Sequence, residues 1–96
     1  MNTATFIRTT TNGGVTQTTY ELSEPMTFKR WTGEKRKTMH VIVSHAQYGG
    51  VDETAVFPGT HDSKVTSYAD LFMTNPTCDD ETALSALGLT IIDPVA

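Results

Sequence analysis

The sequence predicts an α+β protein in which an antiparallel β-sheet is followed by a C-terminal helix. Residues 3–22 and residues 26–44 each show a strand, a glycine-containing turn and a second strand. Residues 77–88 show the acidic start and apolar spacing of a short helix. Several strands followed by one helix are typical of a sheet that is covered on one face.

The first hairpin is expected over residues 3–22. Its first strand, residues 3–11, is rich in threonine, which suits a pleated surface. Asn12-Gly13-Gly14 follows, and an Asn-Gly pair accepts the positive φ angles of a tight hairpin turn. The return strand is expected over residues 15–22 and is predicted to break at Ser23-Glu24-Pro25.

A second hairpin is expected from strands at residues 26–31 and 37–44, joined by a turn at Gly33. Met39, Val41 and Val43 form an apolar row on the second strand, and polar or mixed side chains alternate with them. This pattern predicts a sheet with one face packed against a core and the other free to meet a ligand.

Residues 45–63 form the least regular part of the pattern. They contain Gly49-Gly50 and Pro58-Gly59, so we expect a short strand near residues 51–57 with a long loop on either side. A last strand is expected over residues 64–73, where Val65, Ser67, Ala69 and Leu71 would share one face.

A helix is expected to begin at Thr77, a favourable N-cap residue, and to end at Gly88. Asp79, Asp80 and Glu81 would lie in its first turn, where carboxylates complement the helix dipole. Three residues give this helix an apolar stripe: Ala83, Leu84 and Leu87.

The chain of 96 residues is expected to form a single domain. We divide it into an N-terminal hairpin (1–24), a main sheet (25–74) containing the 45–63 loop, and a C-terminal helix and tail (75–96). A chain this short buries a limited core, so we expect oligomerisation. The formal charge is −4, but residues 29–37 carry +4 and the remainder carries −8. This asymmetry indicates an anionic partner on one surface; the alternative is a solvated hairpin tip, which is the usual explanation of a charge run.

The sequence gives little support for an enzyme or a metal protein. His40 and His45 lie an odd number of residues apart and would point to opposite faces of a strand. The single cysteine, Cys78, has no histidine at a catalytic spacing and excludes an internal disulfide. We therefore expect no catalytic residue, no metal and no cofactor. The N-terminal residues lack the pattern of a signal peptide, and no apolar run is long enough for a membrane span.

The order of several motifs resembles the coat proteins of single-stranded RNA bacteriophages, the leviviruses. Lys35-Arg36-Lys37 and the following strand are similar to the family's basic turn and strand. Gly49-Gly50-Val51 through Pro58 resembles the loop through which neighbouring dimers meet. The most specific similarity is Ser67-Tyr68-Ala69-Asp70-Leu71, followed at the family's interval by Thr77-Cys78-Asp79-Asp80-Glu81.

The resemblance implies a homodimer with one continuous sheet that assembles into an icosahedral shell. Its inner sheet face would bind genomic RNA, as a hairpin, and the virion would assemble in the bacterial host cytoplasm with no membrane partner. The RNA-binding residues implied are Thr27, Lys29, Thr38, His40, Tyr68 and Asp70. The residues implied for contacts between dimers are Gly49, Gly50, Val51, Phe57 and Pro58.

Within that role, Tyr68 would stack on an unpaired base and Asp70 would accept hydrogen bonds from a base edge. Each residue also has an explanation that needs no RNA: Tyr68 could pack on a neighbouring strand, and Asp70 could simply face solvent. The chain also departs from the family in its length, in the short segment between residues 22 and 26, and in its single terminal helix. Two other functions stay open: a β-rich virion decoration or assembly module that binds protein, and a small regulatory nucleic-acid-binding dimer.

Overall fold

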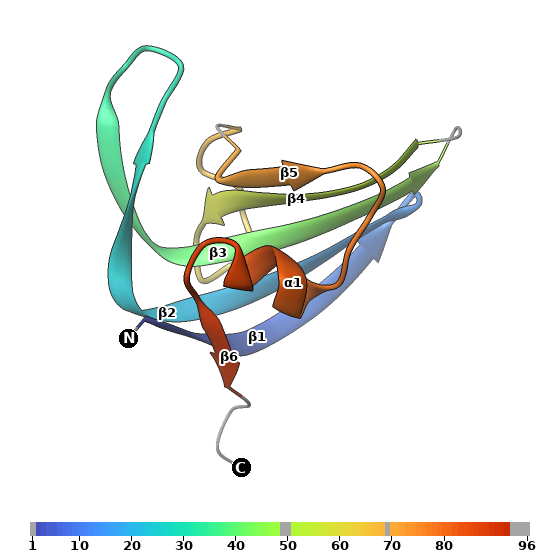
Figure 1. Ribbon diagram of the computed structural model, residues 1–96, viewed down its shortest axis with the longest axis horizontal. Coiled ribbons are helices and arrows are strands. Elements are labelled where there is room, and N and C mark those ends of the chain that lie inside the picture. Colours follow the sequence, from blue (N-terminus) through green and yellow to red (C-terminus); the bar gives the residue numbers. More distant parts are fainter. Residues whose placement is uncertain (1, 49–50, 69, 93–96) are drawn as a thin grey trace.

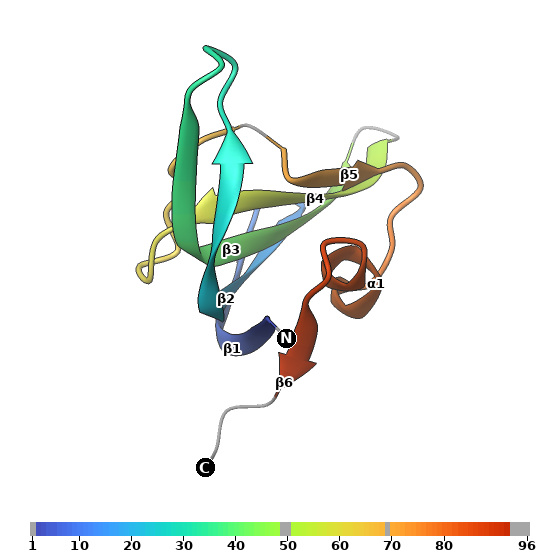
Figure 2. The ribbon, with the colours of Figure 1, turned by 60° about the vertical axis from the view of Figure 1, so that its left-hand side comes forward.

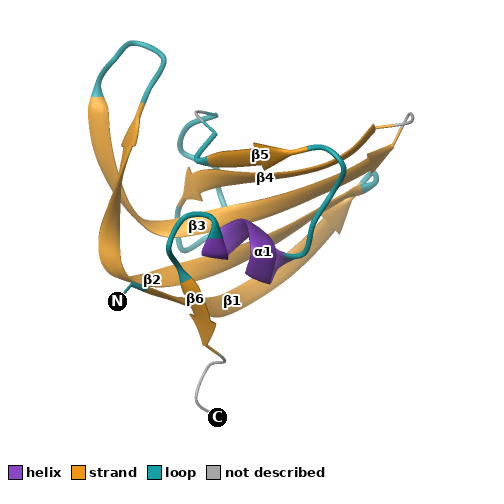
Figure 3. Cartoon of the chain, viewed as in Figure 1, coloured by secondary structure: helices purple, strands orange, loops and turns teal. Residues whose placement is uncertain are grey.

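The computed structural model describes residues 2–48, 51–68 and 70–92, which form a curled six-stranded sheet with one short helix (Figures 1 and 3). The elements are β1 (Thr3–Asn12), β2 (Val15–Lys29), β3 (Lys35–Tyr48), β4 (Val51–Gly59), β5 (Phe72–Thr74), α1 (Asp80–Ser85) and β6 (Thr90–Ile92). The strand order is β5-β4-β3-β2-β1-β6. All neighbours are antiparallel except β1 and β6, which run parallel. This mostly β architecture is compatible with the α+β fold expected from the sequence, although the β1–β6 pair departs from the expected antiparallel sheet.

The N-terminal hairpin forms as predicted. β1 and β2 pair from Ala4 opposite Leu22 to Asn12 opposite Val15. Gly13 and Gly14 have φ angles of 58° and 84°, the left-handed conformation that a tight turn requires.

The predicted break at residues 23–25 is a bulge within a longer strand. The pairing of β2 with β3 shifts register between Glu21 and Met26 and then continues to Lys29. A bulge tolerates Pro25 because the extra residue need not donate to the ladder. The Asn2 side chain bonds the Glu24 N–H and C=O, each at 3.0 Å, and so occupies the backbone groups that the bulge leaves free.

Beyond the bulge, the end of β2 and the start of β3 form a hairpin that rises out of the rest of the sheet (Figures 1 and 2). We call this hairpin, residues 26–38, the arm. Its turn is closed by the Arg30 N–H bonded to the Glu34 carbonyl at 2.8 Å, and Gly33 has a φ of 86°. The second predicted hairpin is therefore confirmed.

Residues 45–63 are more regular than the sequence suggested. β3 extends to Tyr48, and β4 runs antiparallel to it over nine residues, so the expected long loop between these strands is wrong. Burial explains the extension, because Ile42 opposite Phe57 and Val43 opposite Val56 form the inner part of the ladder.

The strand expected over residues 64–73 is also wrong for most of its length. Only Phe72–Thr74 pairs as β5, and Val65 forms an isolated bridge with Gly59. Residues 60–67 instead fold over the sheet face opposite α1, where the Arg8 guanidinium donates to the His61 carbonyl and to Ser63 Oγ. Ser63 has a φ of 66° and also accepts a bond from Thr19 at 2.7 Å. Most of the segment with strand-like alternation therefore forms a loop that packs on the sheet.

One short helix, α1, lies within the region where the C-terminal helix was expected, and a strand follows it. Its N-cap is Asp79, not Thr77, because the Asp79 carboxylate accepts the Thr82 N–H at 2.8 Å. That hydrogen bond holds the pKa of Asp79 below its usual value. Gly88, with a φ of 77°, redirects the chain as predicted. The following residues then pair with β1 as β6, a strand that the sequence pattern did not predict.

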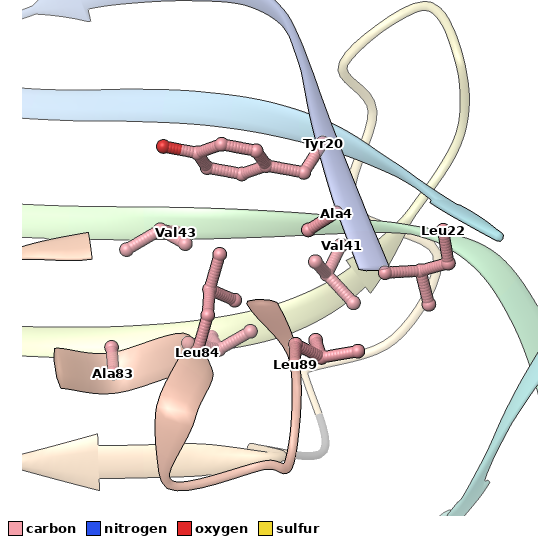
Figure 4. Close-up of a cluster of buried hydrophobic side chains, with 9 residues drawn as sticks. Ala4, Tyr20, Leu22, Val41, Val43, Ala83, Leu84 and Leu89 are labelled. Atoms are coloured by element: carbon pink, nitrogen blue, oxygen red, sulfur yellow. The ribbon is translucent and has the colours of Figure 1, made fainter. Parts of the chain in front are cut away.

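The core lies between α1 and the sheet (Figure 4). Its fully or nearly fully buried members are Ala4, Tyr20, Leu22, Val41, Val43, Val56, Ala83, Leu84 and Leu89. Figure 2 shows α1 on one side of the sheet and the loop after β4 on the other. None of the helical residues in the described part of the chain forms a segment long and apolar enough to span a bilayer.

Candidate functional site

A groove runs between the arm and the segment that joins β4 to β5. It consists of three adjoining hollows of about 520, 360 and 420 Å³. Arg30 lines all three hollows, while Trp31 and Tyr68 line the last two. The bulge in β2 and the Gly33 turn position one wall, and the folded loop after Gly59 positions the other.

Gly59 is where the chain turns away to form the second wall. A Cβ atom built at this glycine would lie 2.6 Å from Ile42 Cδ1 and 3.1 Å from the Lys64 carbonyl oxygen. Ile42 is fully buried, so it has little room to move aside. Glycine therefore allows the loop to pack closely on the sheet and to stand opposite the arm.

The groove has an excess of positive charge. Four cationic side chains and one carboxylate, Asp70, line it, which gives a formal charge of +3 with neutral histidines. Glu34 at the arm tip pairs with Arg30 at 3.4 Å and Arg36 at 2.8 Å, but these pairs are exposed and therefore weak. Lys29 and Lys37 form no ion pair with any residue that the structure describes. The groove is thus suited to an anionic ligand.

Two large aromatic side chains in the groove are exposed. Trp31 is 85% exposed and Tyr68 is 70% exposed. The Tyr68 ring contacts Phe57 edge-on, with ring centroids 5.6 Å apart. Exposed aromatic rings beside cations are the groups that bind unpaired nucleobases in single-strand-binding proteins.

The structure brings together three of the predicted RNA-binding residues. Lys29, Tyr68 and Asp70 line the same hollow, together with Arg30 and Trp31. They come from the arm and from the facing segment, which are about 40 residues apart in the sequence. Their role in RNA binding stays a prediction, but their convergence makes a shared ligand possible.

Thr38 and His40 lie at the inner end of the groove and are largely covered. The Thr38 hydroxyl donates to the His40 carbonyl at 2.7 Å and is also 3.2 Å from the Gly59 carbonyl. The His40 ring packs edge-on against His61, with centroids 5.7 Å apart. Glu21 Oε2 lies 3.4 Å from His40 Nε2 but outside hydrogen-bonding geometry, which leaves this buried nitrogen without a hydrogen bond among the described residues.

Thr27 does not line the groove. In the β2–β3 ladder, Thr27 pairs with Lys37 and Lys29 pairs with Lys35. Directly paired residues point to the same face, and Lys37 alternates with Thr38. The resemblance assigned all of these residues to the inner sheet face, but Thr27 and Lys29 lie on the face opposite Thr38, although Lys29 reaches the outer hollow beside Trp31.

The residues predicted to join neighbouring dimers fall mainly in a strand. Gly49 and Gly50 lie outside the described residues, and Val51 is the first residue of β4. Phe57 and Pro58 pair with Ile42 and Val41 inside the ladder, and Pro58 is fully buried. Phe57 lies in the strand expected near residues 51–57, whereas Pro58, expected in the loop that follows, also belongs to this strand because β3 offers a complementary apolar strand.

Sequence reasoning missed several groove residues, chiefly Arg30, Trp31 and His61. Trp31 is the only tryptophan of the chain and sits at the turn between two basic runs, which was the available signal. Its exposure depends on the arm rising away from the sheet, and the bulge that produces this geometry was interpreted as a chain break.

A second polar cluster lies under α1, on the opposite side of the sheet. The Tyr20 hydroxyl donates to Asp80 at 2.5 Å, and the other Asp80 oxygen pairs with His45. Burial, followed by the hydrogen bond and the charge of Asp80, raises the pKa of Tyr20. Thr54 Oγ1 lies 2.9 Å from His45 Nδ1 and accepts the Cys78 N–H at 3.0 Å.

These bonds attach the start of α1 to β2, β3 and β4. Each polar group named above has a partner inside the protein, which is the pattern of a structural network. Within the described part of the chain, no three His, Cys, Asp or Glu side chains gather as ligands for a metal ion.

No family model matches the chain, and neither a curated protein nor a solved structure matches it.

Proposed function

We propose that this protein is a virus coat protein that associates with copies of itself and binds single-stranded RNA in the groove. The observation that carries the proposal is the convergence of unpaired cations and exposed aromatic rings on one groove, including Lys29, Trp31 and Tyr68. The order of motifs that resembles the RNA-phage coat proteins supports the wider role in a capsid.

The chemistry of the groove favours nucleic acid over a small anion. Cations line both the first and the third hollow, and such a row suits a chain of phosphates, whose neutralisation releases counterions. Exposed rings suit bases that are unstacked, as they are in RNA loops and single strands. Asp70 adds an acceptor that favours bases presenting an amino group and disfavours those presenting a carbonyl.

Incomplete cover of the helix-bearing face supports self-association. α1 has only six residues, and two apolar side chains on its side of the sheet stay partly open: Phe6, 38% exposed, and Met39, 39% exposed. Phe6 lies beside Tyr20 of the core, with ring centroids 6.3 Å apart. A second copy placed on this face would extend the core, as the expected dimer requires.

The two edges of the sheet also support association. β5 and β6 have three residues each, so β5 pairs with only Thr54, Ala55 and Val56 of the nine-residue β4. The backbone groups of β4 that β5 leaves uncovered form a partly open edge, and such groups can pair with another chain. These edges are consistent with the continuous sheet that the proposed dimer would have.

Electron microscopy of the protein expressed alone, with an ultraviolet absorbance spectrum of the same fraction, tests the proposal. Uniform shells with the absorbance of nucleic acid are expected. Small particles free of nucleic acid, together with failure to bind added RNA, would contradict it and favour a decoration module. A small dimer that binds RNA but builds no shell would support RNA binding in the groove and contradict the capsid role.

A further inference from the structure

We infer that Trp31 and Tyr68 form a two-sided stacking site that holds one unpaired base of the RNA. This inference rests on the proposed RNA-binding function and assigns the base to the hollow of about 360 Å³. Trp31 belongs to the arm, and Tyr68 belongs to the facing segment. The two rings therefore stand on opposite walls of the same hollow.

The exposure of both rings is not explained by packing within the chain. Among the described residues, Trp31 makes no ring contact, and the ring contact of Tyr68 is the T-shaped one with Phe57. At 85% and 70% exposure, both rings keep most of their surface in water. A base inserted between them would remove apolar surface of three rings from water in one step.

The backbone on both walls is held before a ligand arrives. The Arg30 N–H and carbonyl bond Glu34 and Gly33, at 2.8 and 2.9 Å, which fixes the turn that carries Trp31. On the other wall the Thr66 N–H bonds the Pro58 carbonyl at 3.0 Å, two residues before Tyr68. Positions fixed in advance reduce the entropy lost on binding.

The charge next to the rings selects a nucleotide over an uncharged aromatic molecule. Arg30 lines the same hollow, and its guanidinium would neutralise the phosphate attached to the stacked base. Lys29 lines the adjoining hollow and would meet the next phosphate along the strand. The site therefore takes a base together with its backbone.

Tryptophan fluorescence tests the site directly, since Trp31 is the only tryptophan. Titration of the intact protein with oligoadenylate should quench its fluorescence as binding proceeds. Inorganic polyphosphate, which carries the charge without bases, should bind and leave the fluorescence nearly unchanged. Anisotropy of a labelled oligoadenylate measures binding independently of the tryptophan.

The outcomes separate this inference from the proposed function. Binding with no quenching would overturn the stacking site and leave the RNA-binding groove in place. Absence of any binding would overturn both. Equal quenching by polyphosphate would show that Trp31 responds to a change of the arm and not to a base, and would also overturn the stacking site.

Substitutions give a second test. Trp31→Leu and Tyr68→Leu should each weaken oligoadenylate binding by roughly 5- to 150-fold, the range for loss of one base stack. Trp31→Phe and Tyr68→Phe should retain most of the affinity because they keep a ring. Since both positions are exposed, circular dichroism should show unchanged folding.

The double variant Trp31→Leu/Tyr68→Leu decides whether the rings share one base. If they do, removing the second ring costs much less than removing the first, and the two effects are not additive. Fully additive losses would assign the rings to two separate bases and overturn the two-sided site.

Discussion

The two polar clusters on opposite sides of the sheet differ in whether their groups are satisfied within the chain. Under α1, the side chains of Tyr20 and His45 both bond Asp80, so each of the three has a partner within the chain. In the groove, Lys29 and Trp31 have no such partner among the described residues. The first arrangement stabilises a fold, and the second is left open to a ligand. Variants under α1 should therefore change the stability of the fold and not RNA affinity, and variants in the groove should change RNA affinity and not stability.

Leu84→Ala should have the largest effect and should act on stability alone. Leu84 is fully buried between α1 and the sheet, so its truncation should lower the free energy of unfolding by about 2–5 kcal/mol. Denaturant unfolding measures the loss, and Ser85→Ala, at an exposed position of the same helix, is the matched control with a change within about 0.5 kcal/mol. An equal loss of unfolding free energy in both variants would contradict the role of Leu84 in the core. Weaker RNA binding by folded Leu84→Ala would contradict the independence of the core and the groove.

Tyr20→Phe should have the next largest effect and should change the response to alkali. Loss of a hydrogen bond to a charged acceptor should cost roughly 1.5–3 kcal/mol at neutral pH. Because the pKa of Tyr20 is raised above its ordinary value of 10.0, the unfolded chain releases this proton first as the pH rises. The stability due to Tyr20 is therefore complete below pH 10 and declines above it.

Denaturant unfolding at several alkaline pH values measures this effect. The stability of the unmodified protein should fall more steeply above pH 10 than that of Tyr20→Phe. Tyr68→Phe, which removes an exposed tyrosine, is the control and should keep the slope of the unmodified protein. Identical slopes in the Tyr20→Phe variant and the unmodified protein would show that the bond to Asp80 does not govern the alkaline response.

Local turn chemistry made the two hairpins predictable from the sequence, whereas packing between distant segments did not. Gly13, Gly14 and Gly33 allow the positive φ angles of the two turns, and these turns formed where expected. The segment around Val65 has the alternation of a strand but is held as a loop by Arg8 and Thr19, which are more than 40 residues away. No local pattern contains that information.

The residues of the candidate site also divide into those that the sequence indicated and those that depend on the three-dimensional arrangement. Lys29, Tyr68 and Asp70 were named through a family resemblance, and the structure brings them to one hollow. Trp31 was missed because its exposure depends on the direction of the arm, which the bulge in β2 sets. A strand pattern gives alternation within one strand, but the register between two strands depends on turn length and bulges.

Lys29→Ala should have a smaller effect, and only on RNA binding. Loss of one phosphate contact should weaken binding several-fold at low salt and should reduce the slope of log affinity against log salt by about 0.7 for a single strand. Filter binding over a salt series measures both quantities. Lys64→Ala, at an exposed lysine outside the groove lining, is the control. Equal changes in the two variants would indicate general attraction and no defined phosphate site.

Thr27→Ala should have the smallest effect and tests the register of the arm. Thr27 is exposed, pairs with Lys37 and lines none of the three hollows, so the substitution should change RNA affinity less than twofold, within the range of an exposed site. Filter binding under the conditions used for Lys29→Ala makes the comparison direct. A loss as large as that of Lys29→Ala would mean that RNA also contacts the face of the arm that carries Thr27 and Lys35, and that the ligand extends beyond the groove.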